Sequence, residues 1–196
     1  MLKLPPKIVA RQLIYVSSDV SNLNILYGGN MGVIRQNWIG IVGLIGLCIG
    51  MPLPHGVLQN SINLVSFIAL VLYAWLGKNE FFTYQQSIVL IGAVLKMLNV
   101  NDLIIASVLV IMSLVAVVKI LQNPVFRVWY TAVGFIGLAG FVYGYATLNP
   151  IAYAVAGVAS TIYSFVSYSK GVKSAFLFGT LNVIYGSIAL YLVFSG

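Results

Sequence analysis

Residues 40–50 read GIVGLIGLCIG, and residues 134–144 read GFIGLAGFVYG. Glycine occupies the same four positions in both stretches, which stand 94 residues apart. Glycines three and four residues apart share one side of a helix, where they let the backbone of a neighbouring helix approach closely. The two stretches therefore predict two closely packed helices in corresponding places of a duplicated structure.

The same offset aligns later parts of the chain without a gap. Identical residues coincide at Ser66/Ser160, Ile68/Ile162, Gly77/Gly171, Val89/Val183 and Gly92/Gly186. We therefore predict two parallel three-helix units, residues 38–99 and 125–196. Two such units point the same way only if an odd number of helices joins them, which predicts one inverting helix in residues 100–124. Parallel repeats recur in transporters, with the substrate site at the midplane between them.

The composition of the 196-residue chain is that of a membrane protein. Hydrophobic residues make up 61% and charged residues 7%, against about 45–50% and about 25% in soluble domains. Ten basic and three acidic side chains cannot cover the surface of a soluble globule of this size. Most of the surface is therefore expected to contact the lipid bilayer.

Seven apolar runs approach or reach the roughly 20 residues that a helix needs to cross a membrane. They are residues 38–54, 57–77, 81–99, 103–122, 128–147, 150–169 and 174–195. Short segments rich in Pro, Gly and Asn separate them, and loops this short make consecutive helices antiparallel. The predicted fold class is an all-α, polytopic integral membrane protein with seven transmembrane helices.

The basic residues predict the orientation, because cytoplasmic loops carry an excess of Lys and Arg. With the N-terminus inside, nine of the ten basic residues fall on the cytoplasmic side and only Lys96 falls outside. We expect a multi-pass protein of the cell membrane, plasma or inner, with its C-terminus outside. Residues 1–37 form a cytoplasmic arm, in which residues 8–16 are either a short interfacial helix or part of a plain tail.

Few residues are available for catalysis or for holding a metal. The chain has one histidine, His55, one cysteine, Cys48, and three carboxylates in separate parts of the sequence. These counts exclude a bis-histidine haem, a disulfide framework and an iron–sulfur cluster. The basic residues form no stripe for nucleic acid. We expect no enzyme activity, no metal, no cofactor and no nucleic-acid partner.

Polar side chains inside the apolar runs mark the candidate site, because polar groups in hydrocarbon are expected to face the interior of a bundle or a cavity. Amides both donate and accept hydrogen bonds, and aromatic rings stack on flat solutes. The selected substrate-binding residues are Asn63, Gln85, Asn182, Tyr163 and Trp75. Each amide has the alternative of a structural bond between helices, which is the interpretation favoured for Asn60 and Gln86.

Residues 70–96, LVLYAWLGKNEFFTYQQSIVLIGAVLK, are similar to a helix, a short loop and a glutamine-bearing helix of the PnuC vitamin transporters. Residues 152–186, AYAVAGVASTIYSFVSYSKGVKSAFLFGTLNVIYG, are similar to the C-terminal helix pair of those proteins. With the repeat, residues 38–196 resemble the 3-1-3 helix arrangement of PnuC and SWEET sugar transporters, and Asn182 resembles the asparagine in the seventh SWEET helix. The PQ dipeptide of the wider superfamily is absent, so the resemblance implies a small-molecule transporter without naming its substrate.

Two functions fit the sequence. The first is a carrier that moves a small neutral polar solute (a sugar, nucleoside or vitamin) by facilitated diffusion, because proton-coupled carriers place carboxylates or histidines at mid-membrane. The alternative is a non-catalytic integral subunit of a larger membrane complex, such as a respiratory or oxidase complex. The repeat favours the carrier, since a scaffold does not require internal symmetry. The sequence does not specify the oligomeric state, and it leaves open a homo-oligomer or a larger membrane complex.

Overall fold

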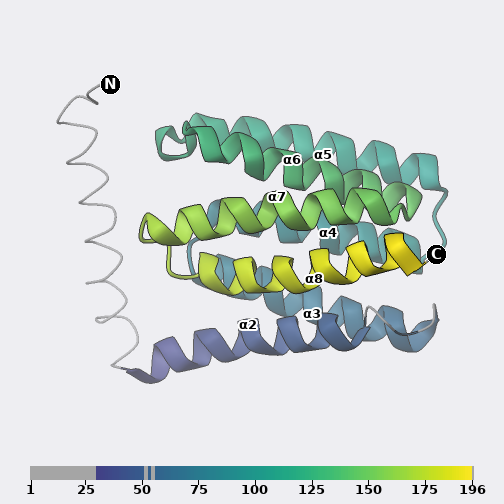
Figure 1. Ribbon diagram of the computed structural model, residues 1–196, viewed down its shortest axis with the longest axis horizontal. Helices are drawn as coiled ribbons and strands as arrows, with labels where there is room; N and C mark the ends of the chain where they lie inside the picture. The colour runs from purple at the N-terminus through teal and green to yellow at the C-terminus, as the bar shows by residue number, and fades with distance from the viewer. Residues whose placement is uncertain (1–29, 51–52, 54–55, 196) are drawn as a thin grey trace. The chain divides into compact units, whose positions relative to one another are not determined.

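The computed structural model describes residues 30–50, Leu53 and residues 56–195, with side chains described from Trp38 to Phe194 in the helices. It divides into two units, residues 1–38 and 39–196. In the second unit, the helix axes are roughly aligned (Figure 1). The candidate interfacial helix at residues 8–16, like the rest of the predicted arm up to residue 29, lies outside the described residues.

The described part of the chain is helical apart from its loops, which confirms the all-α prediction. The helices are α2 (Asn30–Gly50), α3 (Val57–Leu76), α4 (Glu80–Met97), α5 (Asp102–Gln122), the short 3-10 helix η1 (Pro124–Phe126), α6 (Trp129–Thr147), α7 (Pro150–Ser169) and α8 (Ala175–Ser195). Four of them, α3, α5, α7 and α8, are long and apolar enough to cross a membrane.

Six of the seven predicted runs begin and end within two residues of the observed helices. The first run, predicted at residues 38–54, is wrong at both ends, because α2 begins at Asn30 and ends at Gly50. The C-terminal error has a physical reason: Pro52 and Pro54 follow, and a proline disfavours helical geometry in the residue before it.

Asparagines begin three of the long helices. The side chain of Asn79 accepts a hydrogen bond from Phe82 N at the start of α4. Asn101 and Asn149 do the same for α5 and α7. An asparagine in this position satisfies backbone N–H groups that have no partner within the helix. The loop residues that separated the apolar runs therefore also fix where the helices start.

Glycines bring the first and second helices of each predicted unit together, as the glycine stretches predicted. A methyl group on Gly43 of α2 would lie 2.9 Å from the carbonyl oxygen of Ser66 in α3. A methyl group on Gly137 of α6 would lie 3.1 Å from the backbone nitrogen of Ser160 in α7 and would also meet its Oγ. Only a glycine allows this close packing of two helices.

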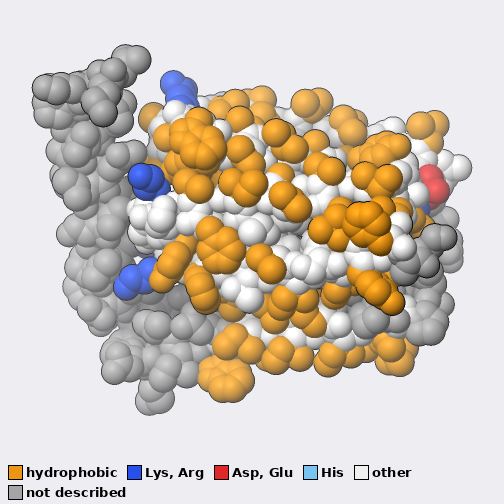
Figure 2. Space-filling view, viewed as in Figure 1, with side chains coloured by type: hydrophobic (Ala, Val, Ile, Leu, Met, Phe, Trp, Pro, Cys, Tyr) orange, Lys and Arg blue, Asp and Glu red, His pale blue; other side chains and the backbone are white. Residues whose placement is uncertain are grey.

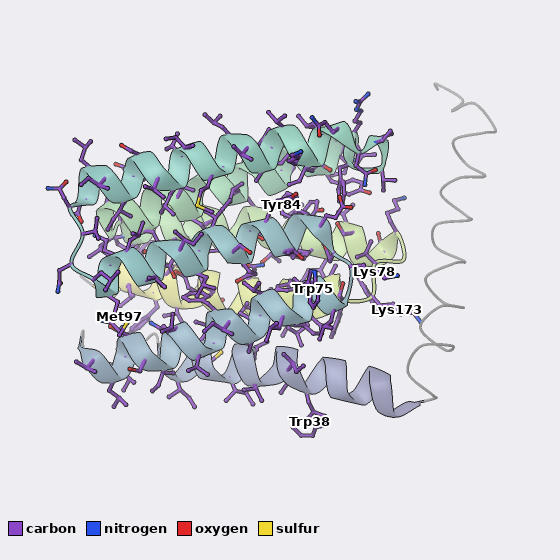
Figure 3. All side chains as sticks on the ribbon, turned by 180° about the vertical axis from the view of Figure 1, so that it is seen from behind. Trp38, Trp75, Lys78, Tyr84, Met97 and Lys173 are labelled. Atoms are coloured by element: carbon purple, nitrogen blue, oxygen red, sulfur yellow. The ribbon has the colours of Figure 1, made fainter. Side chains whose placement is uncertain are left out.

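The charged residues of the described chain gather at the two ends of the helices. Asn79 Nδ2 donates to Ser174 Oγ, and Asn123 Nδ2 donates to Glu80 Oε2, so the α3–α4, α5–α6 and α7–α8 loops lie at one end. We call this end the cationic end; its basic residues are Lys78, Lys119, Arg127, Lys170 and Lys173. Figure 3 places Lys78 and Lys173 there, with Met97 at the opposite end.

At the opposite end, the described charges form a pair. Lys96 Nζ lies 2.6 Å from Asp102 Oδ1 and donates a hydrogen bond to it. Between the two ends, hydrophobic side chains cover much of the visible flank of the bundle (Figure 2). An apolar flank between two polar ends is the surface expected of a protein that lies in a bilayer.

Candidate functional site

Polar side chains lie in the middle of the bundle on two helices that start at the same end. Phe82 and Phe178 stack near the cationic end, with ring centroids 4.2 Å apart and planes inclined by 8°. Because α4 and α8 both begin at that end, one further turn of each helix brings Gln86 and Asn182 to the same depth. Both amides are buried. The two amides come from different predicted units, and both line the same cavity.

Gln85 joins α4 to α7 inside the bundle. Its Nε2 donates a hydrogen bond of 3.0 Å to Ser160 Oγ, whereas its Oε1 has no partner among the described residues. Leaving a buried acceptor without a donor costs about 1–3 kcal/mol. A water or a ligand that donates to Oε1 would therefore be favoured here. We call Gln85, Gln86, Ser160 and Asn182 the central polar layer.

A cavity of about 20 Å³ lies beside the central polar layer. Its lining comes from five helices and consists of Leu47, Phe67, Gln86, Val89, Phe141, Tyr145, Leu181, Asn182 and Tyr185. One water molecule needs at least about 10–15 Å³ by the same measure. The cavity has room for water and is far too small for a sugar or a nucleoside, so the candidate site is closed in this structure.

Aromatic side chains cover the cavity toward both ends of the bundle. Toward the cationic end, ring centroids 4.0 to 5.6 Å apart connect Tyr73, Phe81, Phe82, Tyr163 and Phe178. Toward the opposite end, centroids 5.5 to 5.7 Å apart connect Phe141, Tyr145, Tyr153 and Tyr185. We call these the cationic-side and far-side aromatic layers. A solute entering from either end would have to separate one of them.

Three of the five residues selected from the sequence lie in this interior. Gln85 belongs to the central polar layer, Asn182 lines the cavity, and Tyr163 is a buried member of the cationic-side aromatic layer. Asn182 also donates from Nδ2 to the carbonyl oxygen of Phe178 over 2.8 Å, one turn back along α8. This bond holds the amide in place against its own helix.

The other two selected residues are not brought to the cavity. Trp75 lies in the last turn of α3, near the cationic end, and is 64% exposed, so it faces outward. Asn63 packs against Gly50 of α2, where its Oδ1 would meet a methyl group added to that glycine. Its contact is with a neighbouring helix rather than with the cavity.

Sequence reasoning missed three polar residues of the cavity. Gln86 was interpreted as a bond between helices, and Tyr145 and Tyr185 were not selected. Tyr185 follows Asn182 by three residues, a spacing that places both on one face of a helix. That spacing was the available signal. Tyr145 offered none, because nothing in its local sequence distinguishes it from the exposed Tyr143 two residues earlier.

The geometry defines an apolar helical bundle with a few buried, uncharged polar side chains in its middle. Comparison of the chain with protein-family models, with curated proteins and with solved structures finds no match. Among the described residues, no three His, Cys, Asp or Glu side chains gather in a way that would hold a metal ion.

Proposed function

We propose that the chain is an integral membrane carrier that moves a small neutral polar solute by facilitated diffusion. The observation that carries the proposal is the central polar layer: uncharged amides from α4 and α8 lie buried beside a cavity, and none of the described residues donates to Gln85 Oε1. Burying polar groups in an apolar bundle is unfavourable unless they are satisfied. A solute that donates and accepts hydrogen bonds would satisfy them during transport.

The proposal includes seven membrane crossings and a duplicated architecture of residues 38–99 and 125–196. It is supported by the corresponding contacts of Gly43 with Ser66 and of Gly137 with Ser160. The resemblance of residues 38–196 to the SWEET and PnuC transporters points the same way. The proposed carrier is not an enzyme.

The proposed orientation puts the cationic end in the cytoplasm and the C-terminus outside the cell membrane. Among the described residues of the second unit, residues 39–196, five basic residues and one acidic residue lie at the cationic end, against one basic and one acidic residue at the other. Cytoplasmic loops carry such an excess of basic residues. The N-terminal arm would then be cytoplasmic as well.

Uptake into proteoliposomes tests the proposal. The purified chain is reconstituted and offered labelled sugars, nucleosides and B vitamins, one class at a time. We expect saturable uptake of one class that equilibrates, shows counterflow, and reaches the same level with and without a proton gradient. Accumulation driven by the gradient would contradict facilitated diffusion, and absence of uptake for all three classes would contradict the carrier.

The cavity volume also fits one alternative function, that of a non-catalytic subunit of a larger membrane complex. A bundle whose interior holds no more than water fits a structural subunit as well as a closed carrier. Mild-detergent purification of the tagged chain from its native membrane separates the two. Stoichiometric partner proteins in every preparation support the subunit, whereas a chain that runs alone or as a homo-oligomer supports the carrier.

A further inference from the structure

One face of α7 carries a row of buried hydroxyls. Ser160, Ser164 and Ser167 follow one another at spacings of four and three residues, which places them on one side of the helix. Their exposed fractions are 0%, 0% and 3%. The row, which we call the serine row, runs from the central polar layer to the last turn of α7 at the cationic end.

A hydrogen bond between helices accounts for one of these hydroxyls. Among the described residues, Ser160 is the one member of the row that bonds to another helix, through Gln85. Ser164 Oγ donates to the carbonyl oxygen of Ser160 on its own helix, and Ser167 Oγ has no hydrogen-bond partner among the described residues. Elsewhere α7 buries alanines at Ala152, Ala156 and Ala159, which pack without desolvating a hydroxyl.

The corresponding face of α3 has the opposite chemistry. Ninety-four residues before the serine row stand Ser66, Leu70 and Tyr73, which are 3%, 0% and 3% exposed. Burial is therefore the same on the two helices. Beyond the shared serine, α3 fills the positions with large side chains, whereas α7 keeps small polar ones.

Unpartnered polar atoms on two other helices face the serine row. Within the part of the chain that the structure describes, Gln85 Oε1 on α4 and Thr131 Oγ1 on α6 have no hydrogen-bond partners, and both residues are 1% exposed. Gly137 and Gly134 of α6 pack against Ser160 and Tyr163 of α7. Because α6 and α7 are antiparallel neighbours, the next turn of this register places Thr131 opposite the end of the serine row.

Phe81 of α4 packs beside the row, between α6 and α7. Its ring lies against Tyr163 with centroids 4.0 Å apart, and it is the nearest side chain to Gly134 of α6. It is 1% exposed and comes from α4. Movement of α4 away from α7 would withdraw this ring and uncover the hydroxyls.

We propose that the serine row, with Thr131 and Gln85, lines the path along which water and a hydroxyl-bearing neutral solute reach the central polar layer from the cationic end, and that Phe81 closes it. The inference rests on the proposed carrier function. Serine and threonine hydroxyls donate and accept hydrogen bonds, so they replace the hydration of a neutral solute step by step without binding a charge.

Cysteine accessibility tests the path, because Cys48 is the single cysteine of the chain. In a Cys48→Ser background, Ser164→Cys and Ser167→Cys report on the path. Val158→Cys and Ile162→Cys, at positions 50% and 44% exposed on the outer face of the same helix, are matched lipid-facing controls. Lys173→Cys in the exposed α7–α8 loop marks the cationic side. The probe is a membrane-impermeant methanethiosulfonate added to proteoliposomes.

We expect both serine-row cysteines to react from the cationic side at least about tenfold faster than the lipid-facing controls, because thiolates form in water and not in hydrocarbon. Adding Phe81→Ala should increase their rates further. Rates equal to those of the lipid-facing controls, with Phe81 present and with Phe81→Ala, would overturn the path. Elution of each variant as wild type on size exclusion shows that the comparison concerns folded protein.

Solute uptake by the same vesicles separates this inference from the carrier proposal. Uptake that is blocked by modification of Ser164→Cys supports both. If solute is taken up but the serine-row cysteines do not react, the carrier proposal stands and the proposed path is wrong. If the cysteines react but no solute is taken up, the row still lines a path for water and the carrier proposal is wrong.

Discussion

The two three-helix sets, α2–α4 and α6–α8, are alike in their first two helices and differ in the third. Gly157 of α7 and Gly186 of α8 bring those helices into backbone contact, since a methyl group on Gly157 would lie 2.5 Å from Gly186 Cα. Gly92 is the counterpart of Gly186 on α4, yet it faces Leu109 and Tyr145. The backbone of α8 therefore packs directly against that of α7, whereas the corresponding glycine of α4 faces α5 and α6.

This difference identifies α4 as the helix that distinguishes the two sets. It contributes Gln85 and Gln86 to the interior and Phe81 to the cationic-side aromatic layer. Its tie to α7 includes one hydrogen bond, from Gln85 to Ser160, whereas α8 contacts the backbone of α7 directly at Gly157 and Gly186. If the bundle opens, α4 is the helix expected to move.

The largest effect is expected where α7 and α8 touch. Gly157→Ala places a methyl group against backbone, which cannot move aside, and should destabilise by about 1–3 kcal/mol. Gly92→Ala is the matched variant in the other set, and its methyl group would meet the flexible end of Leu109 at 3.2 Å; it should cost less than about 1 kcal/mol. Thermal unfolding in detergent measures both. Equal losses of stability for the two variants would contradict the proposed difference in packing between α4 and α8.

The first and second helices should respond alike in the two sets. Gly43→Ala and Gly137→Ala each bring a methyl group against backbone atoms of a serine, Ser66 or Ser160. We expect both to destabilise, by about 1–2 kcal/mol, because neither backbone can yield easily. The same unfolding measurement checks this. If one substitution left the stability unchanged and the other unfolded the protein, the first two helices of the two sets would not pack alike.

Helix positions could be predicted closely, because Asn, Pro and Gly mark the ends of apolar runs. Asn79, Asn101 and Asn149 lie in predicted loops and cap α4, α5 and α7. The start of α2 was missed because its first turns lack the apolar run used to recognise a span. Local composition indicates where a helix can cross, not how far it extends beyond.

The site could be predicted only in part, since polarity within an apolar run does not say which way a side chain faces. Gln85 and Asn182 were found because an amide is unusual at such a depth. Gln86 was assigned a different role from Gln85, although α4 buries both by contacting helices on several sides. Trp75 was selected for its ring, yet its place in the last turn of α3 puts it on the outer surface.

A smaller effect is expected from the tie between α4 and α7. Gln85→Leu and Ser160→Ala each remove one partner of the bond, and the double variant completes a thermodynamic cycle. The coupling should be about 0.6 kcal/mol, the average for such bonds between membrane helices. Unfolding of the four proteins gives this number. A coupling several times larger would mean that α4 is held as firmly as α8.

The smallest effect is expected at the end opposite the cationic end. Lys96→Gln removes the ion pair with Asp102, whose side chain is 69% exposed. Exposed pairs of this kind contribute about 0–1 kcal/mol, so the unfolding temperature should change little and less still at high salt. A large loss that salt does not reduce would show that this pair anchors α4 to α5.

Uptake by a variant of the central polar layer tests the carrier most directly. Gln86→Leu with Asn182→Leu keeps similar side-chain volumes and leaves the glycine contacts intact. Solute uptake into proteoliposomes should fall at least about tenfold, the equivalent of about 1.4 kcal/mol, while the unfolding temperature stays within a few degrees of wild type. Undiminished uptake by this folded double variant would contradict a solute site between α4 and α8.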